Sequence, residues 1–431
     1  MPAKLLVIDC AALGADLAAR GPAPAGLTWR RAETVFPALT CVAQASFRTA
    51  AAPGDHGLVA NGLFFPELRK VLFWEQAAAL VQGPRIWSAL RARGGRVGMM
   101  FWQQSLGEDV DLIVSPKPVH KHEGGMIQDC YTQPHDLYER LCADTGRRFN
   151  LMHYWGPLAS HRSSAWITDA TLAVLRAPDL APDLLFTYLP HLDYDLQRRG
   201  PDDPAAARAR EQLLGFLARL VQGAAETGYD VLLFGDYAIS PVTRPAVLPN
   251  CALREAGLFQ VRRLKGMAYP DFFASAAFAV VDHEVAHVFT QGDAATRRAR
   301  EVLAALPGVG AVLDGDARRT IGVEHARSGA FTLVAAPGAW FAYPWFTDKR
   351  EAPDFATHVD IHNKPGYDPC ELFFGWPPPA VSMNTAKIKG SHGRTGPGAE
   401  IAWASTLAFD FEPRTLLDLA RGVRDWCERR R

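Results

Sequence analysis

The chain opens with the stretch KLLVID, residues 4–9, an apolar run that ends in an aspartate, and this pattern decides the expected fold. An unbroken run of this kind is typical of a strand buried on both faces of a parallel sheet. The pattern returns in DLLFTYLPHLD (183–193), which ends at Asp193, and in YDVLLFGD (229–236), which ends at Asp236. Because helical patterns separate these runs, the sequence predicts an α/β fold with a mostly parallel sheet.

The remaining segments extend this alternation of strands and helices. RVGMMFW (96–102) predicts a further strand, and helices are predicted in RIWSALRARGG (85–95), SAWITDATLAVLRA (164–177) and PRTLLDLARGVRDWCERR (413–430). The longest helix is expected over 202–228, with Asp202 or Asp203 as its cap and Gly228 as its stop. Residues 246–345 change to short mixed elements. We expect them to form an inserted cap subdomain on a core made of residues 1–245 and 346–431.

The stretch FAVVDHEVAHVFT (278–290) carries His283, Glu284 and His287 in the order H-E-x-x-H. In zinc proteases this motif lies on a helix, where both histidines share one face. Here the β-branched and aromatic residues predict a strand, which would separate the two histidines by about 13 Å at roughly 3.3 Å per residue. One zinc ion cannot take both, so we expect a strand with two polar residues and no protease.

Composition narrows the class of protein. Lys+Arg and Asp+Glu both number 46 among 431 residues, and this balance gives no support to nucleic-acid binding. No apolar run is long enough to predict a membrane span. Seven scattered cysteines without a CxxC pair favour a reducing compartment, so a cytoplasmic location is expected. None of these features predicts an oligomeric state.

Asp9, Asp193 and Asp236 each follow an apolar strand. Ligands of parallel α/β sheets bind beyond the carboxyl ends of the strands, so the three carboxylates are expected to gather there. A single aspartate at such a place is commonly a helix cap. Three carboxylates held together repel one another unless a cation neutralises them, which predicts a site for hard or borderline divalent metals.

Thr40 lies in FPALTCVAQASFRTA (36–50), after a turn-like segment and before a helical run. A threonine in this place is often a plain helix cap. The same position also suits a nucleophile, because a helix N-terminus favours an oxyanion and a bound phosphate. Cys41 is a rival nucleophile, although no histidine partner marks it.

Taken in order, these motifs resemble the type I phosphodiesterase/nucleotide pyrophosphatase branch of the alkaline phosphatase superfamily. The resemblance covers roughly residues 4–245 and 355–395. It rests on KLLVID with Asp9, FPALT with Thr40, GDHGLVANG with Asn61, YLPHLDYDLQRRGP with Asp193, LLFGDY with Asp236, DIHNKPGYDP with His362 and GSHGR with His392. It implies an alkaline-phosphatase-like three-layer sandwich that hydrolyses a small phosphate ester or nucleotide.

The resemblance also implies roles for these residues. Thr40 would attack phosphorus and form a phosphothreonine, with Asn61 donating to a phosphate oxygen. Two divalent ions are implied, with zinc expected first and magnesium or manganese as alternatives. One would be held by Asp9, Thr40, Asp236 and a histidine directly after it. The other would be held by Asp193, a histidine four residues later and a late histidine.

The sequence departs from this pattern at two positions. Tyr237 and Gln197 stand where histidines are expected, and neither side chain is a normal zinc ligand in its neutral form. We expect His362 and His392 to complete the metal centre, with His358 and Asp360 as weaker candidates. The alternative is a catalytically altered relative that binds a phosphorylated ligand or partner without turnover.

Overall fold

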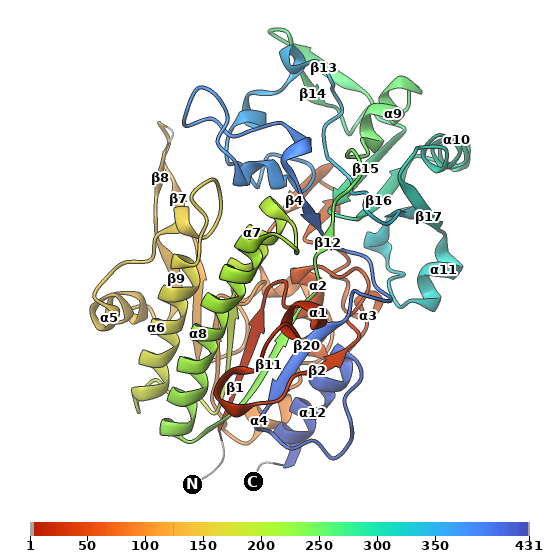
Figure 1. Cartoon of the computed structure of the whole chain (residues 1–431). Helices are drawn as coiled ribbons and strands as arrows, with labels where there is room; N and C mark the ends of the chain where they lie inside the picture. The colour runs from red at the N-terminus through yellow and green to blue at the C-terminus, as the bar shows by residue number, and fades with distance from the viewer. Residues whose placement is uncertain (1–3, 124, 430–431) are drawn as a thin grey trace.

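The structure is a computed structural model that describes residues 4–123 and 125–429 (Figure 1). Its centre is an eight-stranded sheet in the order β2-β20-β11-β1-β10-β5-β6-β9. The five strands from β11 to β6 are parallel, and the outer strands are antiparallel to their neighbours. The strands are β1 (Lys4–Cys10), β2 (Arg30–Ala32), β5 (Val97–Met100), β6 (Leu112–Pro116), β9 (Cys130–Gln133), β10 (Leu184–Leu189), β11 (Tyr229–Gly235) and β20 (Ile401–Ser405).

Helices cover both faces of this sheet, because alternate residues of the central strands point to opposite sides. Leu5 and Val7 of β1 pack in the cluster that contains α2 (Thr40–Thr49), α4 (Ser88–Ala92) and α12 (Leu416–Arg429). Leu6 and Ile8 pack in the cluster on the other face. That face carries α1 (Ala15–Ala18), α5 (Leu137–Thr145), α6 (Arg162–Arg176), α7 (His191–Arg199) and α8 (Pro204–Thr227). The expected three-layer α/β architecture is confirmed.

Local signals in the sequence predict the bounds of the long helix α8 well and those of the short helix α4 poorly. The carboxylate of Asp203 accepts the N–H of Ala205 at 2.8 Å, and α8 ends at Gly228, which adopts the left-handed conformation. Helix α4 is shorter than predicted, because only Ser88–Ala92 are helical within the predicted range 85–95. The two glycines that follow, Gly94 and Gly95, favour this early end.

A second, antiparallel sheet lies beyond the carboxyl ends of the central strands, at the top of Figure 1. Its order is β15 (Ala277–Asp282), β16 (Val285–Thr290), β18 (Phe331–Ala335) and β17 (Val309–Leu313). The same stretch of chain holds α9 (Pro249–Glu255), β13 (Val261–Leu264), β14 (Met267–Pro270), α10 (Asp293–Ala304) and α11 (Gly315–Thr320). Its apolar core also takes in Phe64 and Phe73 from the hairpin of β3 (Gly62–Phe65) and β4 (Lys70–Phe73), and the later Tyr367.

Further short elements lie outside the two sheets. They are α3 (Pro53–His56), the pair β7 (Val119–His120) and β8 (Met126–Ile127), and the pair β12 (Ser240–Pro241) and β19 (Gly390–Ser391). Across the described ranges, no helix has both the length and the apolar character that crossing a bilayer requires.

The stretch 278–290 is a hairpin, so the prediction of one continuous strand is wrong. Asp282 pairs with Val285, and His283 and Glu284 form a two-residue turn between β15 and β16. His283 has a φ of 59°, as the first residue of such a turn requires. The prediction that this stretch is not a helix is confirmed, so the zinc-protease arrangement does not form. His287 lies inside β16, where its Nε2 donates to the carbonyl of Val59 at 2.9 Å.

Helix α2 is buried along its whole length, and aromatic packing holds it on the sheet. The ring of Phe47 stacks on that of Phe234 with centroids 4.6 Å apart and meets Trp102 and Phe186 at 6.1 and 6.3 Å. Because Phe47 lies two turns after Thr40, this packing fixes the start of α2 close to the ends of β1 and β11.

We expect Phe47→Ala to lower the free energy of unfolding by about 3–5 kcal/mol, because it leaves a cavity among aromatic rings. Urea denaturation of the whole chain measures this change. Phe273→Ala is the matched control, since Phe273 is 75% exposed and a surface substitution of this kind changes stability by only about 0.5 kcal/mol. Equal effects of the two substitutions would contradict the role given to Phe47.

Candidate active site

Three buried aspartates gather at the carboxyl ends of the central strands, as the sequence predicts. Asp9 lies at the carboxyl end of strand β1, Asp236 directly follows β11, and Asp193 lies in the first turn of α7, just after β10. β1 pairs with both β10 and β11, so the three segments are neighbours in the sheet. Asp9 and Asp236 are fully buried and Asp193 is nearly so.

Asp9 and Asp236 each leave one carboxylate oxygen without a hydrogen bond within the described part of the chain. Asp9 Oδ2 accepts from Gln44 Nε2 at 2.7 Å, and Asp236 Oδ1 accepts the N–H groups of Ala12 and Tyr237 at 3.0 and 2.9 Å. The partnerless atoms are Asp9 Oδ1 and Asp236 Oδ2. Burial raises the pKa of Asp9 to about 8. Burial and the charge of Asp9 raise the pKa of Asp236 well above its usual range.

Asp193 is held by the two residues that replace the expected histidines. Gln197 Nε2 donates to Asp193 Oδ2 at 2.5 Å, and the Tyr237 hydroxyl donates to Asp193 Oδ1 at 3.1 Å. Burial raises the pKa of Asp193 to about 7, although both hydrogen bonds oppose this shift. Gln197 also bonds to the hydroxyl of Tyr367, which connects Asp193 to the second sheet's core.

Thr40 is the first residue of α2, and its side chain lies between two tyrosine hydroxyls. Thr40 Oγ1 donates to Tyr237 Oη at 3.4 Å and lies 3.5 Å from Tyr188 Oη. Tyr237 Oη in turn donates to Asp193 Oδ1 at 3.1 Å, so it connects Thr40 to this aspartate. The structure therefore brings Thr40 together with the aspartates.

Asn61 is fixed beside the start of α2 by an aspartate from the hairpin. Its Oδ1 accepts the N–H of Cys41 at 3.0 Å, and its backbone N–H and Nδ2 donate to Asp282 at 2.7 and 3.2 Å. Burial raises the pKa of Asp282 to about 6, and the Asn61 backbone bond opposes this shift. The amide of Asn61 thus has a defined orientation next to Thr40.

His392 lies beside Tyr237 and Asp193, and the ring of the turn residue His283 packs against the ring of His392. Their ring centroids are 3.7 Å apart, and His392 also stacks on Tyr237 at 3.5 Å with an interplanar angle of 2°. His392 Nε2 is 3.8 Å from Asp193 Oδ1. Burial lowers the pKa of both histidines well below the usual range, so both rings are neutral near pH 7.

His362 has a different position from His392. Its side chain is exposed, its backbone N–H donates to Asp360, and its ring lies 6.3 Å from that of His120. Its contacts therefore lie at the mouth of the site, while the contacts of His392 lie among the aspartates. His358 is also exposed, and its Nδ1 bonds to the carbonyl of Asp354.

Several of these residues line one cavity of about 710 Å³. Its lining includes Thr40, Asn61 and Asp193 together with His283 and His392. The aromatic residues of its lining include Trp74, Tyr154, Trp155, Tyr188 and Tyr367. Its basic residues include Lys117, His120, His358 and His362. The cavity has room for a small ligand with an aromatic group and a phosphate.

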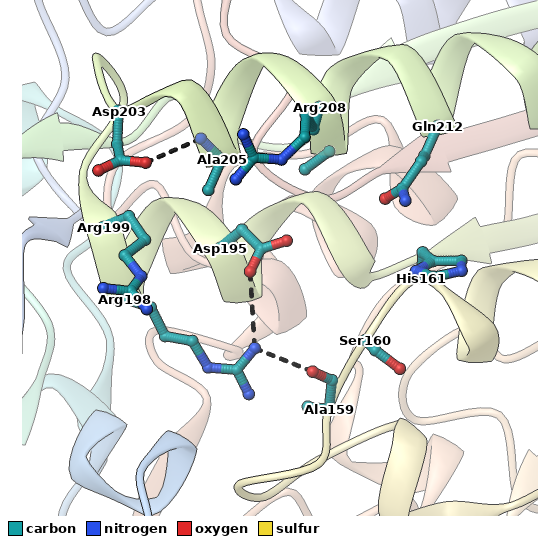
Figure 2. Close-up of a pocket in the computed structure, with 11 residues that line it drawn as sticks. Ala159, Ser160, His161, Asp195, Arg198, Arg199, Asp203, Ala205, Arg208 and Gln212 are labelled. Atoms are coloured by element: carbon teal, nitrogen blue, oxygen red, sulfur yellow. Dashed lines mark hydrogen bonds and ion pairs between the residues drawn. The ribbon is translucent and has the colours of Figure 1, made fainter.

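A second pocket, of about 390 Å³, lies between α7 and α8 and is shown in Figure 2. Arg198 forms an ion pair with Asp195 at 3.6 Å there and donates to the carbonyl of Ala159 at 2.9 Å. None of the three strand-end aspartates lines it. Its contacts anchor α7, the helix that carries Asp193 on its other side.

Two groups of side chains have the chemistry to hold divalent cations. Asp9, Asp236 and Thr40 supply oxygen only, and two of these oxygens are buried without partners in the described residues. Asp193 and His392 supply oxygen and nitrogen 3.8 Å apart. Within residues 4–123 and 125–429, no three histidine, cysteine or carboxylate side chains already surround one point. Binding of a cation would therefore draw these donors together.

Sequence reasoning missed Gln44, Tyr188, Asp282 and His283. Gln44 had a local signal, since it lies four residues after Thr40 on the same face of a predicted helix. Asp282 and His283 had none, because the turn that brings them to the site contains no glycine or asparagine.

The fold is an eight-stranded, mostly parallel α/β sheet with carboxylates and a helix-start threonine at the strand ends, where ligands of such sheets bind. Residues 24–368 match the profile of the type I phosphodiesterase/nucleotide pyrophosphatase family. The chain therefore belongs to this family of phosphoric ester hydrolases, a branch of the alkaline phosphatase superfamily. No curated protein matches the chain in sequence.

Solved structures share the fold at low sequence identity. Phosphonoacetate hydrolase from Sinorhizobium meliloti 1021, in complex with phosphonoformate, has a TM-score of 0.63 and 17% identity, over 99% of this chain and 96% of that one. Murine ectonucleotide pyrophosphatase/phosphodiesterase 5 has a TM-score of 0.61 and 14% identity, over 98% and 95%. An inactive threonine-to-alanine variant of the murine protein, in complex with AMP, has a TM-score of 0.59 and 14% identity, also over 98% and 95%.

We expect Glu284→Gln to leave phosphodiester hydrolysis within a few-fold of wild type and to reveal no protease activity. Glu284 forms an ion pair with Arg394 at 3.3 Å and accepts the backbone N–H of Arg394 at 3.1 Å. These contacts hold the hairpin turn and include none of the proposed catalytic residues. Assays with bis-p-nitrophenyl phosphate and with casein measure the two activities. Casein cleavage by the wild type that disappears in this variant would contradict the assignment.

Proposed function

We propose that the chain hydrolyses small phosphate esters, nucleotides included, with Thr40 as the nucleophile. The observation that carries this proposal is the position of the Thr40 hydroxyl. It lies at the start of a buried helix, lines the cavity, and donates to Tyr237 Oη, which in turn donates to the buried carboxylate of Asp193. The positive end of a helix dipole, together with its free N–H groups, stabilises the negative charge of a phosphate that binds at the N-terminus.

The residues around Thr40 support its role. The Thr40 hydroxyl donates to Tyr237 Oη, which leaves a lone pair of Oγ1 for attack on phosphorus. The new Oγ1–P bond forms as the bond to the leaving alcohol breaks, and that alcohol takes up a proton from solvent. The Thr40 proton passes to Tyr237 Oη as Tyr237 gives its own proton to the carboxylate of Asp193, to which it is hydrogen-bonded. Water then cleaves the phosphothreonine and restores the hydroxyl.

Divalent cations, when bound by Asp9 and Asp236 and by Asp193 and His392, would supply positive charge that stabilises the Thr40 oxyanion and the phosphate oxygens. Asn61 orients a phosphate oxygen, because Asp282 holds its amide beside Thr40. The wall formed by Trp74, Tyr154 and Trp155 suits an aromatic leaving group or a nucleobase.

A second candidate function is binding of a phosphorylated ligand without turnover. It is favoured by Tyr237 and Gln197, which hydrogen-bond to Asp193 at the positions where the family's histidines are expected. The two functions differ in one measurement. The hydrolase releases product from bis-p-nitrophenyl phosphate or a nucleotide ester, while the binding protein only retains the ligand.

We expect Thr40→Ala to lower hydrolysis by at least 1,000-fold, as is roughly the scale for loss of a covalent nucleophile, while the fold remains intact. Loss of one hydroxyl at a helix start changes stability by only about 1 kcal/mol. Thr40→Ser keeps the hydroxyl and is expected to retain part of the activity. Steady-state hydrolysis and mass spectrometry of the trapped phosphoenzyme measure both effects.

Cys41→Ser is the matched control, because it changes the neighbouring rival nucleophile. Its thiol is fully buried, and burial raises its pKa to about 12, so it is not a thiolate at neutral pH. Wild-type turnover by Thr40→Ala, or loss of activity only in Cys41→Ser, would contradict the assignment of Thr40.

A further inference from the structure

His283 is the one member of the H-E-x-x-H motif that reaches the catalytic cavity. The tight turn between β15 and β16 holds it at positive φ, a conformation that side chains other than glycine adopt infrequently and that often marks a functional position. Its ring lies between those of His392 and Tyr367, with centroids 3.7 Å away from each. His283 therefore enters the site from the second sheet.

Hydrogen bonding fixes which nitrogen of each ring carries the proton. His283 Nδ1 lies 2.7 Å from Asp282 Oδ1, and His392 Nδ1 lies 2.8 Å from the carbonyl oxygen of Ala38. A carboxylate and a carbonyl accept hydrogen bonds, so both Nδ1 atoms donate and both Nε2 atoms carry a lone pair. A histidine that donates Nδ1–H to a carboxylate or carbonyl is the usual form of a metal-binding histidine.

The surroundings of the two Nε2 atoms show where a cation could bind. His283 Nε2 is buried without a hydrogen-bond partner in that part of the chain. The closest charged partner of His392 Nε2 is Asp193 Oδ1, another acceptor, at 3.8 Å. A buried lone pair without a donor can be satisfied by a cation, and two imidazoles with one carboxylate form a set that zinc favours.

We propose that His283 supplies the imidazole that is missing at Gln197, so that a zinc ion binds to Asp193, His283 and His392. Gln197 then serves as a positioning residue. It holds Asp193 Oδ2 at 2.5 Å and the hydroxyl of Tyr367, the ring against which His283 stacks. The three donors do not yet surround one point in the structure, so zinc binding draws these side chains together.

This inference concerns the same site as the proposed hydrolysis and rests on it for the functional meaning of the metal. The two are tested separately, because zinc content is measured without turnover. Zinc that depends on His283 in a chain that cleaves no ester would support the metal site and contradict the hydrolase. Hydrolysis by a chain whose zinc content does not depend on His283 would contradict only the metal site.

The test uses the full chain, saturated with zinc, dialysed and measured by elemental mass spectrometry. His283→Asn removes the imidazole and retains a residue that tolerates positive φ. It is expected to lose about one equivalent of zinc per chain. His362→Ala, at the cavity mouth, is the matched control and is expected to retain the wild-type content. A His283→Asn protein with wild-type zinc content, or loss of zinc in His362→Ala instead, would overturn the proposal.

A second variant separates loss of a ligand from loss of the fold. Gln197→His in the His283→Asn background restores an imidazole four residues after Asp193 on α7, and it is expected to restore the lost equivalent. In the cobalt-substituted protein, the visible absorption bands are expected to change in His283→Asn and to remain in His362→Ala. Failure of the double variant to regain zinc, with a native circular dichroism spectrum, would also count against His283 as a ligand.

Discussion

The burial of three carboxylates at neighbouring strand ends is the constraint around which the site is built. An ionised carboxylate is costly to remove from water unless hydrogen bonds or a counter-charge compensate it. Gln44, Gln197, Tyr237 and backbone N–H groups compensate part of this cost. The oxygens of Asp9 and Asp236 that lack partners among the described residues show where compensation is incomplete. A concentration of unbalanced negative charge of this kind favours cations and groups that donate protons.

The β15–β16 hairpin, the start of α2 and the carboxyl ends of the central strands meet around the three aspartates. The segment 392–394 connects them, because His392 and Gly393 accept N–H groups from Glu284 of the hairpin and from Ala38 before α2. Phe47 and its aromatic neighbours hold α2 against one face of the central sheet. The distance between Thr40 and the aspartates is thus set by packing of the core, while the positions of Asn61 and His283 are set by the hairpin.

The sequence was sufficient for the parts of the molecule that depend on local pattern. The apolar runs before Asp9, Asp193 and Asp236 predict β1, β10 and β11, and Asp203 and Gly228 mark the ends of α8. The hairpin could not be predicted, because β-branched residues continue through both of its strands and its turn lacks the residues that usually adopt positive φ. The contacts of Asp282 with Asn61 join positions 221 residues apart, which no local pattern reports.

The two-residue turn of the hairpin has a consequence for how the molecule could have changed over time. Since side chains alternate along both strands, inserting or deleting a single residue there would point His283 away from the cavity and break the Asp282–Asn61 contact. Insertions and deletions are therefore expected to accumulate elsewhere in the second sheet, in loops remote from this tip. The part of the molecule that holds the second sheet can vary in size and outline, but the turn at His283 and Glu284 is tied to the core as closely as a strand register.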